Sequence, residues 1–170
     1  VAHGLLRELC ASGERREPRP VRLDVLEHGR VRRADVLEAR LGEPRAHAPN
    51  DLLKGVRHPI IGYYGALASW VDVPLLTRIA REHSDATVVL AGGKFDVDLS
   101  PVEALPNVRI LGQRPYAEMP KLLWNFDACV IPFLVNDITE ATNPVKFYEY
   151  VFGGKPVVSH VRGSADIVQH

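Results

Sequence analysis

The sequence predicts an α/β fold with a doubly wound, Rossmann-like parallel sheet over residues 59–160. Apolar runs of strand length recur in this part of the chain, as expected of strands buried on both faces. Segments with helical spacing of apolar residues separate these runs, so strand and helix alternate. The right-handed crossover rule then places the strands in one parallel sheet with helices on both faces. In such a sheet, we expect a ligand to bind at the carboxyl ends of the strands.

The strands are expected in apolar segments that are bounded by turn residues. PIIGYY at 59–64 leads into a Gly turn, ATVVLA at 86–91 ends before two glycines, and NVRILG spans 107–112. DACVIPF at 127–133 and PVVSH at 156–160 complete the set by the same criteria. The helices between them are expected over about 73–83, 116–125 and 143–152. Pro120 is expected in the first turn of its helix, because an interior proline would break it.

The helix at 143–152 has start and stop signals at both ends. Asn143 is suited to cap the helix, and Pro144 to occupy the first helical position, where no N–H is required. Gly153 or Gly154 is suited to the left-handed conformation that closes a helix. Glu149 lies in the middle of the helix between two tyrosines, so it requires either water or a partner that offsets its desolvation.

The composition is that of an ordinary globular protein, with 46% hydrophobic and 25% charged residues and a net charge of zero. This balance gives no general attraction to nucleic acid, which we do not expect as a partner. Two cysteines without a metal-like spacing predict neither a disulfide framework nor a zinc site, so a cytoplasmic location is the expectation. No apolar stretch approaches the roughly 18 residues of a membrane span, and no signal peptide is evident.

Residues 1–58 differ from the rest of the chain. They are rich in Arg and Pro and poor in strand signals, and short helices are expected only near 1–12 and 33–41. We therefore predict an irregular, partly helical or disordered linker over 1–58 and a ligand-binding domain over 59–170.

Several common nucleotide and catalytic motifs are absent. AGGKFD and FGGKPV lack the spacing of a phosphate-binding Walker loop, and no Gly-x-Gly-x-x-Gly follows the first strand. There is no Gly-x-Ser-x-Gly nucleophile motif. A receiver-type signalling domain is also disfavoured, because IIGYYGAL has no acidic cluster.

Four blocks, however, occur in an order and spacing that are specific: IIGYYGAL, ATVVLAGG, LPNVRILGQRPYAEMPKLLWNFDACVIPF and TNPVKFYEYVFGGKPVVS. Over about 100 residues the chain resembles the C-terminal, nucleotide-sugar-binding domain of GT-B glycosyltransferases, in the retaining family four group of bacterial cell-envelope enzymes. The resemblance implies transfer of a sugar from a UDP- or GDP-linked donor to an acceptor hydroxyl with retention, without a metal or a further cofactor.

The resemblance also implies roles for residues at the carboxyl edge. Glu149 would bind the ribose hydroxyls, because a carboxylate accepts two hydroxyl protons well. Lys146 is the candidate catalytic residue, since its charge would stabilise the departing diphosphate. The candidate donor-binding residues are Gly65, Arg114, Tyr116, Asn143, Pro144, Val145, Lys146 and Glu149.

Two further candidate residues come from a departure from the family pattern and from the end of the last expected strand. The family pattern has a second glutamate eight residues before Glu149, where this chain has Ala141, so Glu140 is a candidate one position away. His160, at the end of the last strand, is a candidate ligand contact. The basic pair that usually follows the first strand is absent, since ALASWVD stands there. These departures leave two alternatives open, a non-catalytic nucleotide-binding module and a nucleotide-sugar epimerase of the same architecture.

The resemblance finally implies a larger enzyme. The acceptor, a glycan or a lipid-linked sugar, would bind to an N-terminal domain that precedes this segment, and the last helices of the fold would follow His170. We therefore expect this truncated donor-binding half to be inactive alone, and the whole enzyme to work in the cytoplasm, with peripheral association at the inner face of the membrane.

Overall fold

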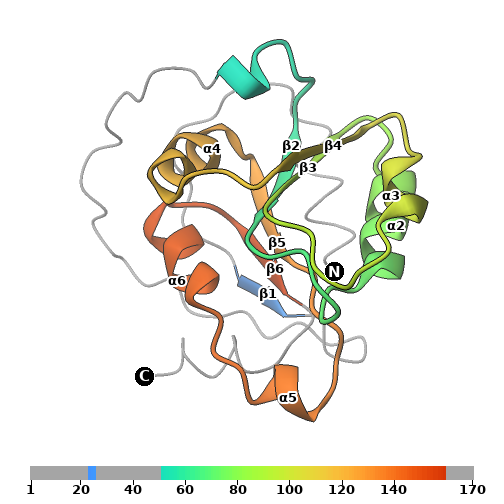
Figure 1. Ribbon diagram of the computed structural model, residues 1–170. Coiled ribbons are helices and arrows are strands. Elements are labelled where there is room, and N and C mark those ends of the chain that lie inside the picture. The colour runs from blue at the N-terminus through green and yellow to red at the C-terminus, as the bar shows by residue number, and fades with distance from the viewer. Residues whose placement is uncertain (1–22, 26–50, 160–170) are drawn as a thin grey trace.

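The computed structural model describes residues 23–25 and 51–159. Within these residues, six strands form one parallel sheet with helices on both faces (Figure 1). The strands are β1 (Leu23–Val25), β2 (Ile60–Tyr64), β3 (Thr87–Ala91), β4 (Val108–Gly112), β5 (Ala128–Ile131) and β6 (Val157–Ser159). The predicted α/β class with a parallel sheet is confirmed.

The strand order is β1-β6-β5-β2-β3-β4, and every pairing is parallel. The chain passes outward from β2 to β3 and β4, and then returns past β2 to β5 and β6. The order therefore reverses between β2 and β5. Open α/β sheets bind ligands in the crevice outside such a reversal.

The helices lie on the two faces of the sheet, as the doubly wound arrangement requires. Figure 1 shows α2 and α3 on one side and α4 and α6 on the other. The helices are α2 (Val73–Glu82), α3 (Ser100–Glu103), α4 (Met119–Asn125), α5 (Asp137–Glu140) and α6 (Val145–Phe152), with 3₁₀ turns η1 (Asp51–Leu53) and η2 (Tyr116–Glu118). Pro120 lies in the first turn of α4, as predicted. The one-turn elements η1, α3 and α5 were not predicted, because one turn is too short to show a helical period.

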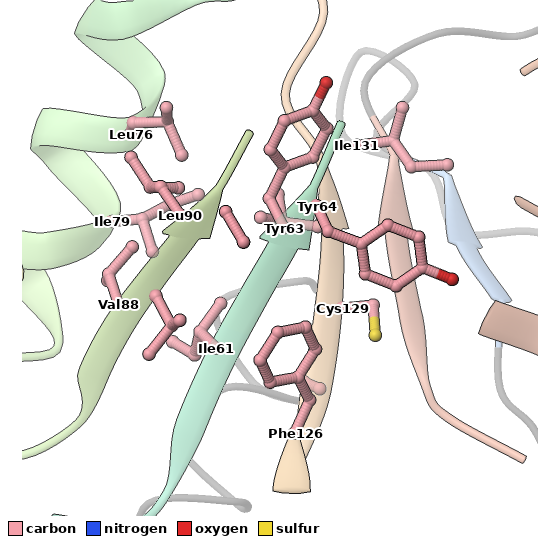
Figure 2. Close-up of a cluster of buried hydrophobic side chains, with 14 of the residues drawn as sticks. Ile61, Tyr63, Tyr64, Leu76, Ile79, Val88, Leu90, Phe126, Cys129 and Ile131 are labelled. Atoms are coloured by element: carbon pink, nitrogen blue, oxygen red, sulfur yellow. The ribbon is translucent and has the colours of Figure 1, made fainter. Parts of the chain in front are cut away.

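β2 lies at the centre of the hydrophobic core, with apolar side chains on both of its faces (Figure 2). On the face that α2 covers, Leu76 packs toward Leu90 of β3. On the opposite face, Tyr64 lies near Phe126 and Cys129. Strands buried on both faces explain why the apolar runs in the sequence are continuous rather than alternating.

Gly62 of β2 is a position where a close approach requires glycine. A Cβ atom there would lie 2.1 Å from the ring of Phe126. The ring of Phe126 thus packs directly on the β2 backbone, which draws the start of β5 against the middle of the sheet.

The carboxyl end of α6 is closed by a glycine, as predicted. Gly154 has φ of 68°, in the left-handed region. The N–H of Gly154 donates to the carbonyl of Val151 at 2.9 Å, and the N–H of Lys155 donates to the carbonyl of Tyr150 at 3.0 Å. This pair of bonds is the Schellman closure, and it turns the chain directly into β6.

The segment expected to be an irregular linker, 1–58, contributes to the sheet. Leu23–Val25 forms β1, which pairs with β6 in parallel register. Leu53 is buried in the core, so the packed region begins before residue 59. A three-residue strand among Arg- and Pro-rich residues carries too little pattern to be recognised alone. The helices expected at 1–12 and 33–41 lie outside the described residues.

None of the helices in the described part of the chain has both the length and the apolar character of a membrane-spanning segment.

Candidate functional site

The candidate site lies at the carboxyl edge of the sheet, beside the reversal between β2 and β5. A crossover helix runs opposite in direction to its strands, so α6, which joins β5 to β6, begins at this edge. β2 and β4 end at this edge, so the segments that follow them begin here as well. Gly65, Tyr116 and Lys146 belong to these three segments, so the fold brings residues far apart in sequence to one edge.

Two glycines allow the backbones that follow β2 and β3 to approach each other closely. Gly65 has φ of 138°, a conformation that other residues avoid. A Cβ atom at Gly92 would lie 1.8 Å from the carbonyl oxygen of Gly65. The N–H of Gly65 donates to the carbonyl of Ala91, and the N–H of Leu67 donates to the carbonyl of Gly93, both at 2.8 Å. These contacts fix the turn after β2 as a backbone platform beside the site.

The Lys146 side chain lies across this platform. Its Cε and Nζ atoms are 1.8 and 2.6 Å from the position that a Cβ atom on Gly65 would occupy. The Nζ atom lies 5.8 Å from the centre of the Tyr63 ring, within range of a cation–π interaction. Burial lowers the pKa of Lys146, and the nearby Glu149 carboxylate opposes that shift. The ammonium group is thus held at the carboxyl end of β2.

The Glu149 carboxylate is half-buried and interacts with tyrosines from two other segments. The Tyr116 hydroxyl donates a hydrogen bond to Oε1 of Glu149 at 2.5 Å. This bond is the main cause of the raised pKa of Tyr116. Burial raises the pKa of Tyr64, and the Glu149 carboxylate raises it further. Glu149 therefore has partners within the site and does not simply face bulk water.

A buried hydrogen bond holds α6 against β2. The backbone N–H of Tyr64 donates to the hydroxyl of Tyr150, which is fully buried, at 3.1 Å. The two rings meet edge to face with their centres 5.0 Å apart. Because Tyr150 is next to Glu149 on the helix, this anchor sets the position of the carboxylate relative to the end of β2.

The first turn of α6 differs from the prediction at two residues. Pro144 has an extended backbone and takes the N-cap position, the helix begins at Val145, and no side chain caps it. Asn143 therefore lies one residue too early to cap, and its amide donates to the Tyr148 hydroxyl at 2.8 Å. The N–H of Phe147 donates to the carbonyl of Pro144 at 2.9 Å, and no side chain of the N-cap residue accepts from the earlier N–H groups of the turn, so this end of α6 is suited to an anion.

The other predicted residues lie less directly on the site. Val145 is exposed at the start of α6. The Nε atom of Arg114 donates to the carbonyl of Leu111 at 3.1 Å, which turns this side chain back toward its own strand. Glu140 is the exposed last residue of α5. His160 lies outside the described residues. The roles proposed for these side chains stay predictions.

Sequence reasoning missed Tyr64 and the anchor formed by Tyr150. Both residues carry a phenol into the neighbourhood of Glu149, one from the end of β2 and one from the same helix. A signal was present, because IIGYY ends an otherwise aliphatic strand with two tyrosines at the edge where ligands are expected.

The arrangement has a clear chemical character. It offers a carboxylate for hydroxyl groups, one ammonium group and the amino end of a helix for phosphate, and backbone that a ligand can approach closely. Among residues 23–25 and 51–159, no group of three His, Cys, Asp or Glu side chains is placed to hold a metal ion. The site is therefore suited to a ligand with vicinal hydroxyls at one end and phosphate at the other.

Comparison with known proteins gives one relative by sequence. The chain is 26% identical over 126 residues to TuaH of Bacillus subtilis (strain 168), provisionally described as a teichuronic acid biosynthesis glycosyltransferase. The chain is homologous to this cell-envelope protein. The match covers 72% of the chain and 32% of TuaH, so the chain spans about a third of its relative. No family model matches the chain.

Among solved structures, the chain is similar to Anabaena Alr3699/HepE, which was crystallised in complex with UDP and glucose. The two are 22% identical, with a TM-score of 0.49, and the match covers 73% of this chain and 37% of that one.

Proposed function

We propose that this chain is the donor-binding half of a glycosyltransferase that transfers a sugar from a nucleoside diphosphate sugar to an acceptor hydroxyl with retention. The observation that carries the proposal is the placement of Lys146 in the first turn of α6 and of Glu149 one turn later, beside the sheet reversal. Homology to TuaH supports the reaction class. The donor is a substrate linked to UDP or GDP, and no metal or other cofactor is part of the proposal.

The two ends of the site would bind the two ends of the nucleotide. Glu149 would accept hydrogen bonds from both ribose hydroxyls. Hydrogen bonds to a charged carboxylate are stronger than those to a neutral acceptor. Lys146 and the first N–H groups of α6 would bind the diphosphate, and Gly65 allows backbone to approach it. The ribose and the diphosphate of one nucleotide would thus be held by residues of a single helix.

The chemical step would depend on the diphosphate end. Breaking the bond between sugar and phosphate develops negative charge on the departing diphosphate. A fixed ammonium group and aligned N–H groups at that point stabilise the charge without reorganising. Lys146 is the proposed catalytic residue for this reason, and the Gly65 platform fixes its position.

The acceptor would be bound by the remainder of a longer protein. Because the chain spans about a third of TuaH, we propose that the acceptor, a glycan or lipid-linked sugar of the cell envelope, is recognised outside the described residues.

One observation favours a second candidate, a nucleotide-binding module without transfer chemistry. Ala141, exposed after α5, stands where the resemblance would place a second glutamate, and Glu140, the last residue of α5, is exposed. Such a module would bind nucleotide as proposed, whereas the complete protein would transfer no sugar.

The proposed site is tested by recording amide spectra of the chain during titration with UDP and with GDP. Shifts should concentrate at residues 143–149 and at Gly65, while amides of α2 stay in place and serve as the internal control. Shifts distributed over the surface, or none at all with either nucleotide, would contradict the donor-binding proposal.

A further inference from the structure

Tyr116 has an unusual combination of exposure and polar contact. Its side chain is 73% exposed, yet its hydroxyl makes the 2.5 Å hydrogen bond to Oε1 of Glu149. Few apolar contacts hold an aromatic side chain that is so exposed, so this hydrogen bond is the main contact that orients it. The phenol therefore occupies an acceptor position of the carboxylate without being fixed there by packing.

Tyr64 provides a direct contrast on the same carboxylate. It is 5% exposed, its ring packs edge to face on Tyr150, and its backbone is part of β2. Tyr64 thus belongs to the fixed wall of the site. Tyr116 belongs to the 3₁₀ turn η2, which follows the extended Pro115, and its side chain can rotate away without opening the core.

We propose that Tyr116 is an exchangeable partner of Glu149, whose hydroxyl occupies the position that one hydroxyl of a ligand's vicinal diol takes when it binds. A carboxylate oxygen and a phenol make the same type of bond as a carboxylate oxygen and a ribose hydroxyl. The inference rests on the proposed function, because it assigns the ribose of a nucleoside diphosphate as the competitor.

Exchange has a consequence for specificity. A nucleotide with both ribose hydroxyls replaces the Tyr116 bond with two new ones, whereas a nucleotide that lacks them has nothing to offer Glu149. Only a ligand with the diol has to break the Tyr116 bond, so Tyr116 lowers the affinity for the ribose nucleotide and leaves that for a nucleotide without the diol unchanged. Tyr116 therefore reduces the difference in affinity between the two ligands, and it keeps the Glu149 carboxylate hydrogen-bonded until a diol replaces it.

The test compares the chain with Tyr116→Phe and, as the matched control, Tyr64→Phe. Each is titrated calorimetrically with UDP and GDP and with the 2′,3′-dideoxy form of each nucleotide. Because a phenylalanine ring has no hydroxyl to compete for Oε1, Tyr116→Phe should bind the ribose nucleotide roughly threefold to tenfold more tightly. Its affinity for the dideoxy nucleotide should not change. Tyr64→Phe alters the fixed wall of the site and should not tighten the binding of the ribose nucleotide or of the dideoxy nucleotide.

The outcomes separate this inference from the proposed function. Equal or weaker binding of the ribose nucleotide by Tyr116→Phe, with normal binding by the unaltered chain, would overturn the exchange and leave the donor site intact. A gain for the dideoxy nucleotide as large as that for the ribose nucleotide would also overturn it. Failure of the unaltered chain to bind either UDP or GDP would remove both the proposed function and the inference. Tyr116 is exposed, so the unfolding midpoint of Tyr116→Phe should match that of the unaltered chain.

Discussion

Lys146 and Gly65 form a matched pair across the site, with the Cε atom of Lys146 where a Cβ atom on Gly65 would otherwise lie, 1.8 Å away. The glycine is required twice, once by its φ of 138° and once by the lysine stem that passes over it. The pair connects the end of β2 to the first turn of α6. The position of the ammonium group is therefore determined by the turn after β2 as much as by the helix.

Gly65→Ala should weaken nucleotide binding by more than its effect on folding accounts for. The new methyl group would strain the backbone and displace Lys146 from the platform, so that the ammonium group no longer faces the diphosphate. We expect a loss of about 1 kcal/mol or more of unfolding free energy and a loss of roughly tenfold or more in UDP or GDP affinity, since a charge-assisted contact is lost. Chemical denaturation and calorimetric titration measure the two effects.

Gly55→Ala is the control for this experiment. Gly55 also has a positive φ, 74°, but a Cβ atom there would meet nothing within 4 Å. This variant should lose stability by a similar backbone mechanism and retain its nucleotide affinity. Equal affinities of the two variants would show that Lys146 is not positioned by Gly65.

Tyr150→Phe should destabilise the fold through the anchor between α6 and β2. The substitution leaves the buried N–H of Tyr64 without the hydroxyl that accepts its hydrogen bond. An unpaired buried donor costs about 1–3 kcal/mol. Tyr148→Phe is the matched control, because the Tyr148 hydroxyl accepts from Asn143 in an exposed position and its loss should change stability by less than about 0.5 kcal/mol. Urea unfolding that ranks the two variants equally would contradict the anchor.

The pH dependence of binding should report on Lys146. Burial lowers the pKa of this lysine, so its charge is lost at a lower pH than that of an ordinary lysine. Nucleotide affinity should therefore fall as the pH rises, and the fall should begin below the usual lysine range. A bound diphosphate is anionic and favours the protonated form of Lys146. The same shift means that the folded chain holds this proton less tightly than the unfolded chain, so its contribution to stability becomes less unfavourable as the pH rises through the lowered pKa.

Lys146→Met separates this titration from that of other groups. It should bind nucleotide more weakly at neutral pH and show a flat profile where the unaltered chain declines. An alkaline decline of the same size in Lys146→Met would assign the effect to another group.

Much of the fold could be predicted from the sequence because the strands are buried on both faces. Runs such as ATVVLA are continuously apolar, and the stop signal at Gly154 is local, so neither depends on a distant contact. β1 could not be predicted in the same way, since Leu23–Val25 becomes a strand by pairing with β6. The position of the α6 start was displaced by one residue, because Pro144 remains extended.

The site could be predicted as a set of residues but not as a set of contacts. Glu149 and Lys146 were recognised from their motif, and Tyr116 from its place after β4. The hydrogen bond between Tyr116 and Glu149, and the passage of Lys146 over Gly65, depend on how separate segments meet at the sheet edge. No local pattern encodes such distances.

The central claim is that Glu149 binds the hydroxyls of a nucleoside diphosphate. The most direct measurement is calorimetric titration of UDP and GDP into the chain, into Glu149→Gln and into the control Glu103→Gln, an exposed residue of α3, with the unfolding free energy of each measured in parallel. We expect Glu149→Gln to lose roughly tenfold or more in affinity, because hydrogen bonds to a charged acceptor are lost. Its stability should change little, and Glu103→Gln should bind as the unaltered chain does. Unchanged affinity in Glu149→Gln, or a loss of binding that only parallels a loss of folding, would contradict the claim.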